Sequence, residues 1–305
     1  MNIKELLRHI TASQHPRIPF GTAHNSGELV KSTGVVTSTT PTMVTASQAR
    51  SLYCGAGAYY GPAETCGNIK KDAELLGMSE SKLESSLERK VVLDLGSGIG
   101  RFARESALRR KHQRNYPSPV RIDSLNIRYS MLDYGNLLDE IINSGPTDTS
   151  LSYESNNGTK KVAFNDPDVI EAVSEAKAEF LGLDWHDLSS IPREEYDVIL
   201  SVNGFPYYSD FSFNRPENEK EAMQCANKEK DFLVFGNDSK MVFQQLIPLL
   251  KRGGVMMLTT QCPSWLWKHS TDQFKNDFRD FFASNNCIAE VIQTEQKLIL
   301  KISKQ

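Results

Sequence analysis

The chain has 305 residues, with 35 Lys and Arg against 38 Asp and Glu, and a formal net charge of −3. A net charge this small creates no global field that would attract nucleic acid or an anionic membrane, and no apolar run approaches the ~20 residues of a membrane span. For these reasons we expect no nucleic-acid or membrane partner. The five cysteines are scattered, without paired or zinc-ligand spacing, so we expect reduced thiols and a cytoplasmic location.

The first quarter of the chain differs in composition from the rest. Residues 1–10 alternate as a short amphipathic helix with three charged side chains, which is not the pattern of a secretory signal. Residues 11–45 are rich in Ser, Thr, Gly and Pro and predict a long loop or a partly ordered arm. Helical spacing at 63–76 and 79–87 then predicts a helical cap. We therefore expect an arm and cap over residues 1–88 and a second unit over residues 89–305.

A strand, a glycine turn and a helix follow directly. Val91 to Asp94 has the apolar character of a buried parallel strand, and Gly96, Gly98 and Gly100 follow with single-residue spacing. An amphipathic run then predicts a helix over 101–111. Such a unit places a nucleotide-like ligand at the carboxyl edge of a parallel sheet, where glycine allows a tight turn against bare backbone. The spacing differs from the G-x-G-x-x-G of dinucleotide-binding proteins.

Strands and helices continue to alternate along the rest of the chain. We expect strands at 120–127, 180–183, 196–203 and 255–259, helices at about 130–142, 169–180, 240–250 and 274–282, a polar surface loop over 144–166, and a terminal antiparallel pair formed by 287–293 and 297–302. Gly253 and Gly254 are interpreted as the C-cap of the helix before the fifth strand. This order predicts an α/β fold with a Rossmann-like, doubly wound and mostly parallel sheet, a terminal antiparallel strand and an α-helical N-terminal cap.

The run from Asp94 to Gly100 resembles motif I of the class I S-adenosylmethionine-dependent methyltransferases. The resemblance implies that S-adenosyl-L-methionine is the cofactor and that five residues of the run lie against it: Asp94, Gly96, Ser97, Gly98 and Gly100. Arg101 completes the Gly-Ile-Gly-Arg of protein N-terminal methyltransferases, in which the arginine pairs with the carboxylate of the cofactor. The alternative for Arg101 is a solvated side chain at a helix start.

Two further segments resemble the cofactor-binding signatures of this family. The second strand commonly ends in an acidic residue that binds the ribose hydroxyls, and Asn126 stands at that position. Asp123 is the other candidate, although it lies earlier on the strand. Asp184 matches the residue that accepts the adenine amino group, and Trp185 is placed to cover the adenine face. The alternative for Asp184 is a helix N-cap.

The segment 196–201 matches the fourth strand of the family, whose end lies beside the methyl acceptor. The segment 203–208 therefore supplies the candidate catalytic residues, Asn203 and Tyr207. It carries no acidic residue of the kind that catechol-type enzymes use to bind a metal, so we expect no metal. The run from Asn203 to Tyr207 departs from the Asn-Pro-Pro-Tyr of enzymes that methylate exocyclic or amide nitrogens.

The resemblance implies a methyltransferase that acts on a small-molecule or protein acceptor. The alternative is a catalytically inactive module of the same fold that binds the cofactor or scaffolds a partner. A nucleotide-dependent dehydrogenase is disfavoured by the glycine spacing. The basic run at 109–114 is interpreted as a solvated helix end that complements the helix dipole, with a patch for an acidic substrate as the alternative. The sequence specifies neither the acceptor nor the oligomeric state.

Overall fold

The structure is a computed structural model, and it describes residues 69–97, 100–125, 150–163, 166–181, 183, 185, 187–202, 235–261, 273–294 and 297–305. The predicted arm, the first part of the predicted cap and the predicted helix over 130–142 lie outside these residues. No helix within the described ranges is long and apolar enough to cross a membrane.

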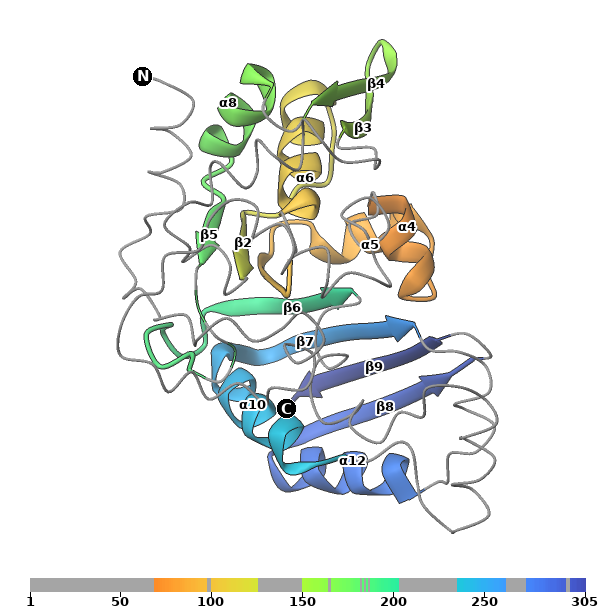
Figure 1. The fold of residues 1–305 in the computed structure, drawn as a ribbon, viewed down its shortest axis with the longest axis vertical. Coiled ribbons are helices and arrows are strands. Elements are labelled where there is room, and N and C mark those ends of the chain that lie inside the picture. Colours follow the sequence, from red (N-terminus) through yellow and green to blue (C-terminus); the bar gives the residue numbers. More distant parts are fainter. Residues whose placement is uncertain are drawn as a thin grey trace, which may run out of the picture.

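A seven-stranded sheet forms the centre of the molecule, as Figure 1 shows. Its strands lie in the order β5-β2-β1-β6-β7-β9-β8 and are β1 (Val91–Leu95), β2 (Arg121–Leu125), β5 (Glu179–Leu181), β6 (Tyr196–Val202), β7 (Leu250–Gln261), β8 (Cys287–Gln293) and β9 (Lys297–Lys304). The first five are mutually parallel, whereas β9 runs antiparallel to both β7 and β8. This topology confirms the predicted Rossmann-like sheet and its terminal antiparallel pair.

Alternation along the strands sends side chains to two separate cores. On β1, Leu93 and Leu95 join a large cluster with the helices α10 (Asn237–Leu249) and α12 (Gln273–Ser284). Val92 instead joins a cluster on the opposite face, with the helices α4 (Ile69–Leu75), α5 (Glu80–Leu87) and α6 (Arg101–His112). Because successive strand residues point to opposite faces, Asp94 shares the face of Val92 and looks toward α4 and α6.

The α10 and α12 face is filled largely by phenylalanine. Phe282 is fully buried, and its ring lies 4.9 Å from that of Phe243 and 4.7 Å from that of Phe278. The spacing of Phe274, Phe278 and Phe282 places all three on one side of α12, as the helical pattern of the sequence predicts. This side of the sheet is therefore a packed apolar core, and polar groups gather on the other side.

The predicted surface loop over residues 144–166 is wrong for its described part, residues 150–163. The structure has a two-stranded antiparallel hairpin there, β3 (Ser150–Ser155) and β4 (Gly158–Ala163), joined at Asn156 and Asn157. The signal was present in the Asn-Asn-Gly turn, since Gly158 has φ of +98°. The flanking strands are so polar that only Leu151 and Tyr153 supply a buried side. The helix predicted over 169–180 is also shorter, because α8 spans Pro167–Glu175 and β5 begins at Glu179.

Gly253 and Gly254 do not cap α10, which corrects the sequence interpretation. The helix ends at Leu249 with Leu250 as its C-cap, and both glycines lie inside β7. There the pairing with β6 shifts register between Tyr196 and Val198. A Cβ on Gly254 would stand 2.9 Å from the carbonyl oxygen of Asp197, so the close approach of the two backbones requires glycine at this point.

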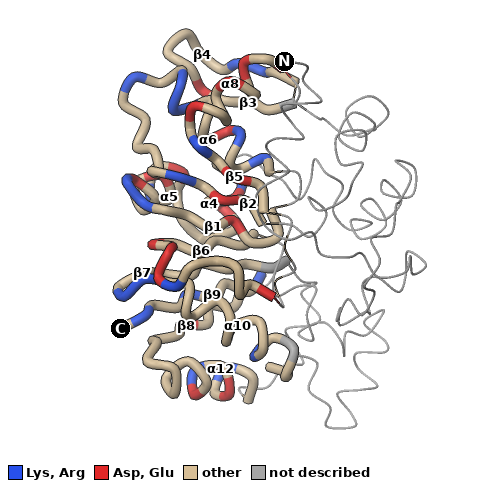
Figure 2. Tube along the Cα trace, turned by 90° about the vertical axis from the view of Figure 1, so that its left-hand side faces the viewer, with Lys and Arg blue, Asp and Glu red and all other residues tan. Residues whose placement is uncertain are grey.

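Helices α4 and α5 are tied to α6 by buried ion pairs. Glu105 accepts a hydrogen bond from the backbone N–H of Ile69 at 2.9 Å. Arg109 reaches the carboxylates of Glu80, Glu84 and Glu105 at 2.6–2.7 Å, with only 7% of its side chain exposed. The predicted solvated helix end is therefore wrong for Arg109. In the part of the chain that Figure 2 colours, both basic and acidic positions occur along α5 and α6.

Candidate functional site

The glycine turn lies at the point where the strand order reverses. From β1 the sheet extends through β2 to β5 on one side and through β6 to β7 on the other (Figure 1). In open parallel sheets of this kind, ligands bind outside the carboxyl ends of the strands at such a switch point. The turn from β1 into α6 occupies this position, and so does the end of β6, whose continuation from Asn203 lies outside the described residues.

Backbone hydrogen bonds fix the turn against the neighbouring strand. The N–H groups of Gly96 and Ser97 both donate to the carbonyl oxygen of Leu125, at 2.9 and 3.1 Å. The Ser97 hydroxyl donates to the same oxygen at 3.3 Å. Gly96 and Gly100 both have φ of +72°, a left-handed conformation that glycine adopts without strain. The predicted need for glycine is thus confirmed at these two positions, whereas Gly98 lies outside the described residues.

Asp94 is a buried carboxylate at the end of the central strand. Only 6% of the residue is exposed, and burial raises the pKa of its carboxyl group to about 7. Among the described residues, no hydrogen bond reaches this carboxylate. A buried charge without a donor is costly to the folded chain, so the position favours a ligand that brings a positive charge or N–H donors to it.

Arg101 is the first residue of α6 and is also buried, with 7% exposed. The alternative of a solvated helix-start arginine is therefore wrong. Its positive charge acts on the carboxylate of Asp72 in α4, which places the two groups near each other. A guanidinium beside the glycine turn has the charge and the planar donor geometry that a ligand carboxylate requires.

Asp72 is a residue of this site that sequence reasoning missed. It is 5% exposed, and burial, followed by the negative charges of Asp94 and Glu105, holds the pKa of its carboxyl group well above the usual range. Its position three residues after Ile69 and four before Leu76 places it on the apolar side of α4. An acidic residue at an apolar position of a predicted helix was the available signal.

The other candidate for the end of the second strand, Asp123, is engaged in the fold. It accepts a hydrogen bond from the Tyr196 hydroxyl at 2.9 Å and pairs with the Arg121 guanidinium at 2.9 Å. Alternation places it on the same face as Leu125, toward α10, and away from the side chain of Asp94. Asp123 is therefore a structural residue, and Asn126 remains the sequence-based candidate, outside the described residues.

We expect Tyr196→Phe to lower the free energy of unfolding by about 1–3 kcal/mol, because the buried Asp123 carboxylate loses one of its donors. Affinity for S-adenosylhomocysteine should stay within about twofold of the wild type. Urea denaturation and calorimetry measure the two quantities. A loss of affinity with unchanged stability would instead return Asp123 to the list of ligand-binding residues.

The remaining predicted residues are only partly described. Trp185 is half-buried and packs against the core cluster on the α10 face. Asp184 beside it lies outside the described residues, as do Asn203 and Tyr207. The glycine turn, Asp94 and Arg101 are therefore the part of the predicted site that the structure brings together.

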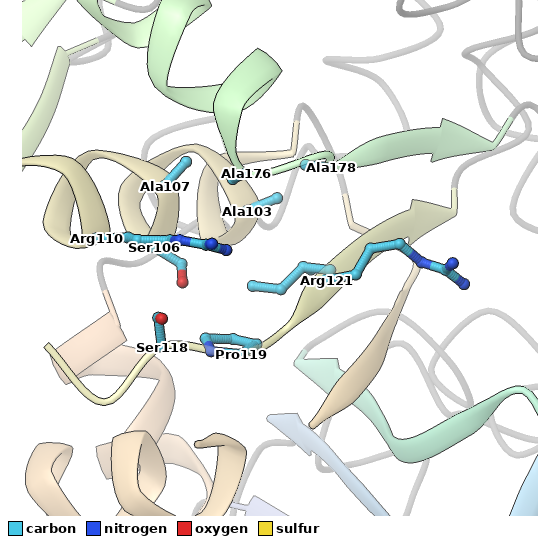
Figure 3. Close-up of a pocket in the computed structure, with 10 residues that line it drawn as sticks. Ala103, Ser106, Ala107, Arg110, Ser118, Pro119, Arg121, Ala176 and Ala178 are labelled. Carbon is cyan, nitrogen blue, oxygen red and sulfur yellow. The ribbon is translucent and has the colours of Figure 1, made fainter. Parts of the chain in front are cut away.

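A shallow hollow lies elsewhere on the molecule (Figure 3). It is lined by α6 residues such as Ser106 and Arg110, by Ser118 and Pro119 before β2, and by Ala178 before β5. Ser118, Pro119 and Ala178 therefore lie at the amino ends of parallel strands, on the edge of the sheet opposite the glycine turn. In Figure 3 the Arg121 guanidinium points away from Arg110, whereas the hydroxyl groups of Ser106 and Ser118 point toward each other.

Comparisons with solved structures return methyltransferases. A protein from Methanococcus maripaludis, assigned as an S-adenosyl-L-methionine-dependent methyltransferase, aligns over 88% of this chain and 97% of its own, with 14% identity and a TM-score of 0.45. The antibiotic-resistance methyltransferase Kmr aligns over 74% and 93%, with 12% identity and a TM-score of 0.39. The N-methyltransferase NodS from Bradyrhizobium japonicum, solved with S-adenosyl-L-homocysteine, aligns over 77% and 85%, with 12% identity and a TM-score of 0.36.

No protein-family model matches the sequence, and no curated protein matches it significantly. With identities and TM-scores this low, the fold class rests on the strand order of the chain itself. That order, with the antiparallel β9, gives the Rossmann-like fold that the resemblance to class I methyltransferases implies.

Proposed function

We propose that the protein is an S-adenosylmethionine-dependent methyltransferase that transfers a methyl group to a small-molecule or protein acceptor. The observation that carries the proposal is the buried Asp94 carboxylate, which no described donor reaches, beside a glycine turn at the switch point of the sheet. The methionine part of the cofactor has both an ammonium and a carboxylate group. At this turn Asp94 offers a negative charge to the ammonium group and Arg101 a positive charge to the carboxylate, so the residues present fit the cofactor.

The cofactor, when bound, supplies an activated methyl group on a sulfonium. The task of the protein is then to orient the two reactants and to exclude water. We assign the backbone of Gly96, Ser97 and Gly100 to the surface against which the ligand lies. Asp94 and Arg101 would fix its amino-acid end, and Asn126, Asp184 and Trp185 its nucleoside end.

The acceptor side is assigned from the sequence. The chain leaves β6 at Val202, beside the end of β1, and continues into Asn203 and Tyr207. We propose these two residues as the ones that orient the acceptor. An amide and a phenol can hold a neutral acceptor, and the ring of Tyr207 can stabilise a nearby sulfonium.

Calorimetry with S-adenosylhomocysteine and with NAD tests the cofactor assignment. We expect micromolar binding of S-adenosylhomocysteine and no binding of NAD at the same concentrations. Binding of NAD alone would overturn the proposal in favour of a dehydrogenase.

Transfer of a labelled methyl group to metabolites and to protein extract then tests the activity and identifies the acceptor. The expected result is labelled product with the wild type and a lower rate of methyl transfer in Asn203→Ala and Tyr207→Phe, with cofactor affinity within about twofold of the wild type. Binding without any transfer would favour the inactive, cofactor-binding alternative.

A further inference from the structure

One row of side chains crosses the sheet at the level of Asp94. The strand pairings place Phe180 of β5, Ser124 of β2, Asp94 of β1, Leu200 of β6 and Met257 of β7 in register. Since neighbours in register share a face, the whole row looks toward α4 and α6. Its outer members are apolar, whereas Ser124 and Asp94 stand side by side at its centre.

Neither central residue is satisfied by the described part of the chain. Ser124 is fully buried, and its hydroxyl has no hydrogen-bond partner there. No described donor reaches the carboxylate of Asp94 either. Buried polar groups in folded proteins are nearly always paired, so the unpaired Ser124 hydroxyl, next to a carboxylate that no described donor reaches, indicates a missing partner at the switch point of the sheet.

Asp72 lies on α4, which packs over the face of the sheet that carries this row. It lies on the apolar side of α4, whose neighbouring residues Ile69 and Ala73 pack in the same cluster as Val92 and Leu200. The end of α4 is fastened to the sheet, because the Thr259 hydroxyl donates to the carbonyl oxygen of Leu75 at 3.1 Å. Asp72 is nine-tenths buried, and no described donor reaches its carboxylate.

We propose that Asp72 and Asp94 together form the receptor for the ammonium group of the cofactor's methionine part, with α4 supplying a residue from outside the glycine-turn motif. This inference rests on the proposed function. An ammonium group carries three N–H donors, and the two carboxylates with the Ser124 hydroxyl offer it three acceptor groups. Arg101, beside Asp72, would meet the carboxylate of the same ligand.

The two carboxyl groups of Asp72 and Asp94 also couple cofactor binding to proton release. The charged groups that act on Asp72 are Asp94 from β1, Glu105 and Arg101 from α6, and Lys71 on its own helix. Without a cation between them, two buried carboxylates favour the protonated form, and the pKa values of Asp72 and Asp94 are both raised. An arriving ammonium group favours the ionised pair, so binding near pH 7 releases protons, and affinity falls as the pH is lowered below about 7.

The test compares S-adenosylhomocysteine with its deamino analogue, in which hydrogen replaces the ammonium group. Dissociation constants are measured by calorimetry at pH 7.5 for the wild type, Asp72→Asn and Asp168→Asn. Asp168 lies on α8 and pairs with His112 and Lys111, so its variant is the matched control. We expect the wild type and the control to prefer S-adenosylhomocysteine by about tenfold or more, and Asp72→Asn to reduce that preference to about threefold or less.

A second readout separates binding from structure. Calorimetry in two buffers of different ionisation enthalpy should show proton release by the wild type at pH 7 and less release by Asp72→Asn. The melting temperature of the unliganded variant should be equal to or above that of the wild type at pH 8.

Two outcomes overturn the inference while leaving the proposed function in place. One is an unchanged preference in Asp72→Asn. The other is equal weakening of both ligands together with a lower melting temperature, which would make Asp72 a structural partner of Arg101. A wild type that binds neither ligand would instead refute the proposed function itself.

Discussion

Arg109→Met should lower the free energy of unfolding by about 3–5 kcal/mol, the cost of removing one partner from a buried ion pair. The Arg109 side chain is 7% exposed and that of Glu105 1% exposed, and their nitrogen and oxygen atoms lie 2.7 Å apart. Burial, with a smaller contribution from the negative charge of Glu80, raises the pKa of the Glu105 carboxyl group to about 7 against the opposing effects of Arg109 and the Ile69 N–H. Methionine fills the volume of the arginine stem but leaves the carboxylate without its counter-charge.

The loss should be felt first in α4 and α5. The same guanidinium holds Glu80 and Glu84 of α5, while Glu105 holds the first N–H of α4. Amide hydrogen exchange should therefore speed up across residues 69–87 and change little in β7 and β9. Because α4 carries Asp72, affinity for S-adenosylhomocysteine should fall as well.

The neighbouring residue provides the control for this prediction. Arg110 is exposed, so Arg110→Met should change the free energy of unfolding by no more than about 0.5 kcal/mol. Glu105→Gln combined with Arg109→Met should recover part of the stability, because the unpaired buried charge is then gone. Equal, small effects of the Arg109 and Arg110 variants would show that the ion pairs contribute nothing beyond a solvated helix end.

The sheet could be predicted from the sequence because its signals are local. Val91 to Leu95 and Tyr196 to Val202 are short apolar runs, and each is followed by a break in pattern. Helix α12 repeats phenylalanine at every fourth position. The glycine turn is also a local signal. The left-handed φ values at Gly96 and Gly100 favour glycine, and glycine is the residue that the sequence has at both positions.

The missed features depend on contacts between segments far apart in the chain. Glu105 and Arg109 read as ordinary charged helix positions until α4 and α5 cover them. The proximity of Asp72 to Asp94 depends on the packing of α4 against the sheet, which the sequence does not show. The hairpin β3–β4 was missed because its polar strands satisfy each other through backbone hydrogen bonds rather than through an apolar pattern.

Asp94→Asn should strengthen the fold and weaken the cofactor site. Burial raises the pKa of the Asp94 carboxyl group to about 7, well above the value near 3.9 of an unfolded chain. Between about pH 4 and pH 7, the folded state thus holds a proton on Asp94 that the unfolded state has released. The stability that this proton contributes is fully present below about pH 4 and is lost as the pH rises through about 7.

Asparagine has nearly the same shape and no charge, so the gain in stability from Asp94→Asn should appear as the pH rises through about 7. We expect a gain in the free energy of unfolding of about 1–3 kcal/mol at pH 8 and almost none at pH 4, measured by urea denaturation. Asp168→Asn, which removes a carboxylate paired with Lys111 and His112, should show no gain at pH 8. A gain of the same size at both pH values would contradict the assignment of the effect to the charge of Asp94.

Binding should change in the opposite direction. A charge-assisted hydrogen bond contributes about 1.5–3 kcal/mol, so S-adenosylhomocysteine should bind Asp94→Asn about 10- to 100-fold more weakly at pH 8. The two opposite effects, measured on one variant, separate a ligand-binding carboxylate from a structural one, since loss of a structural carboxylate would lower stability and affinity together. If the variant is more stable and binds as tightly as the wild type, the glycine turn holds the ligand without Asp94, and the ammonium group must be sought elsewhere.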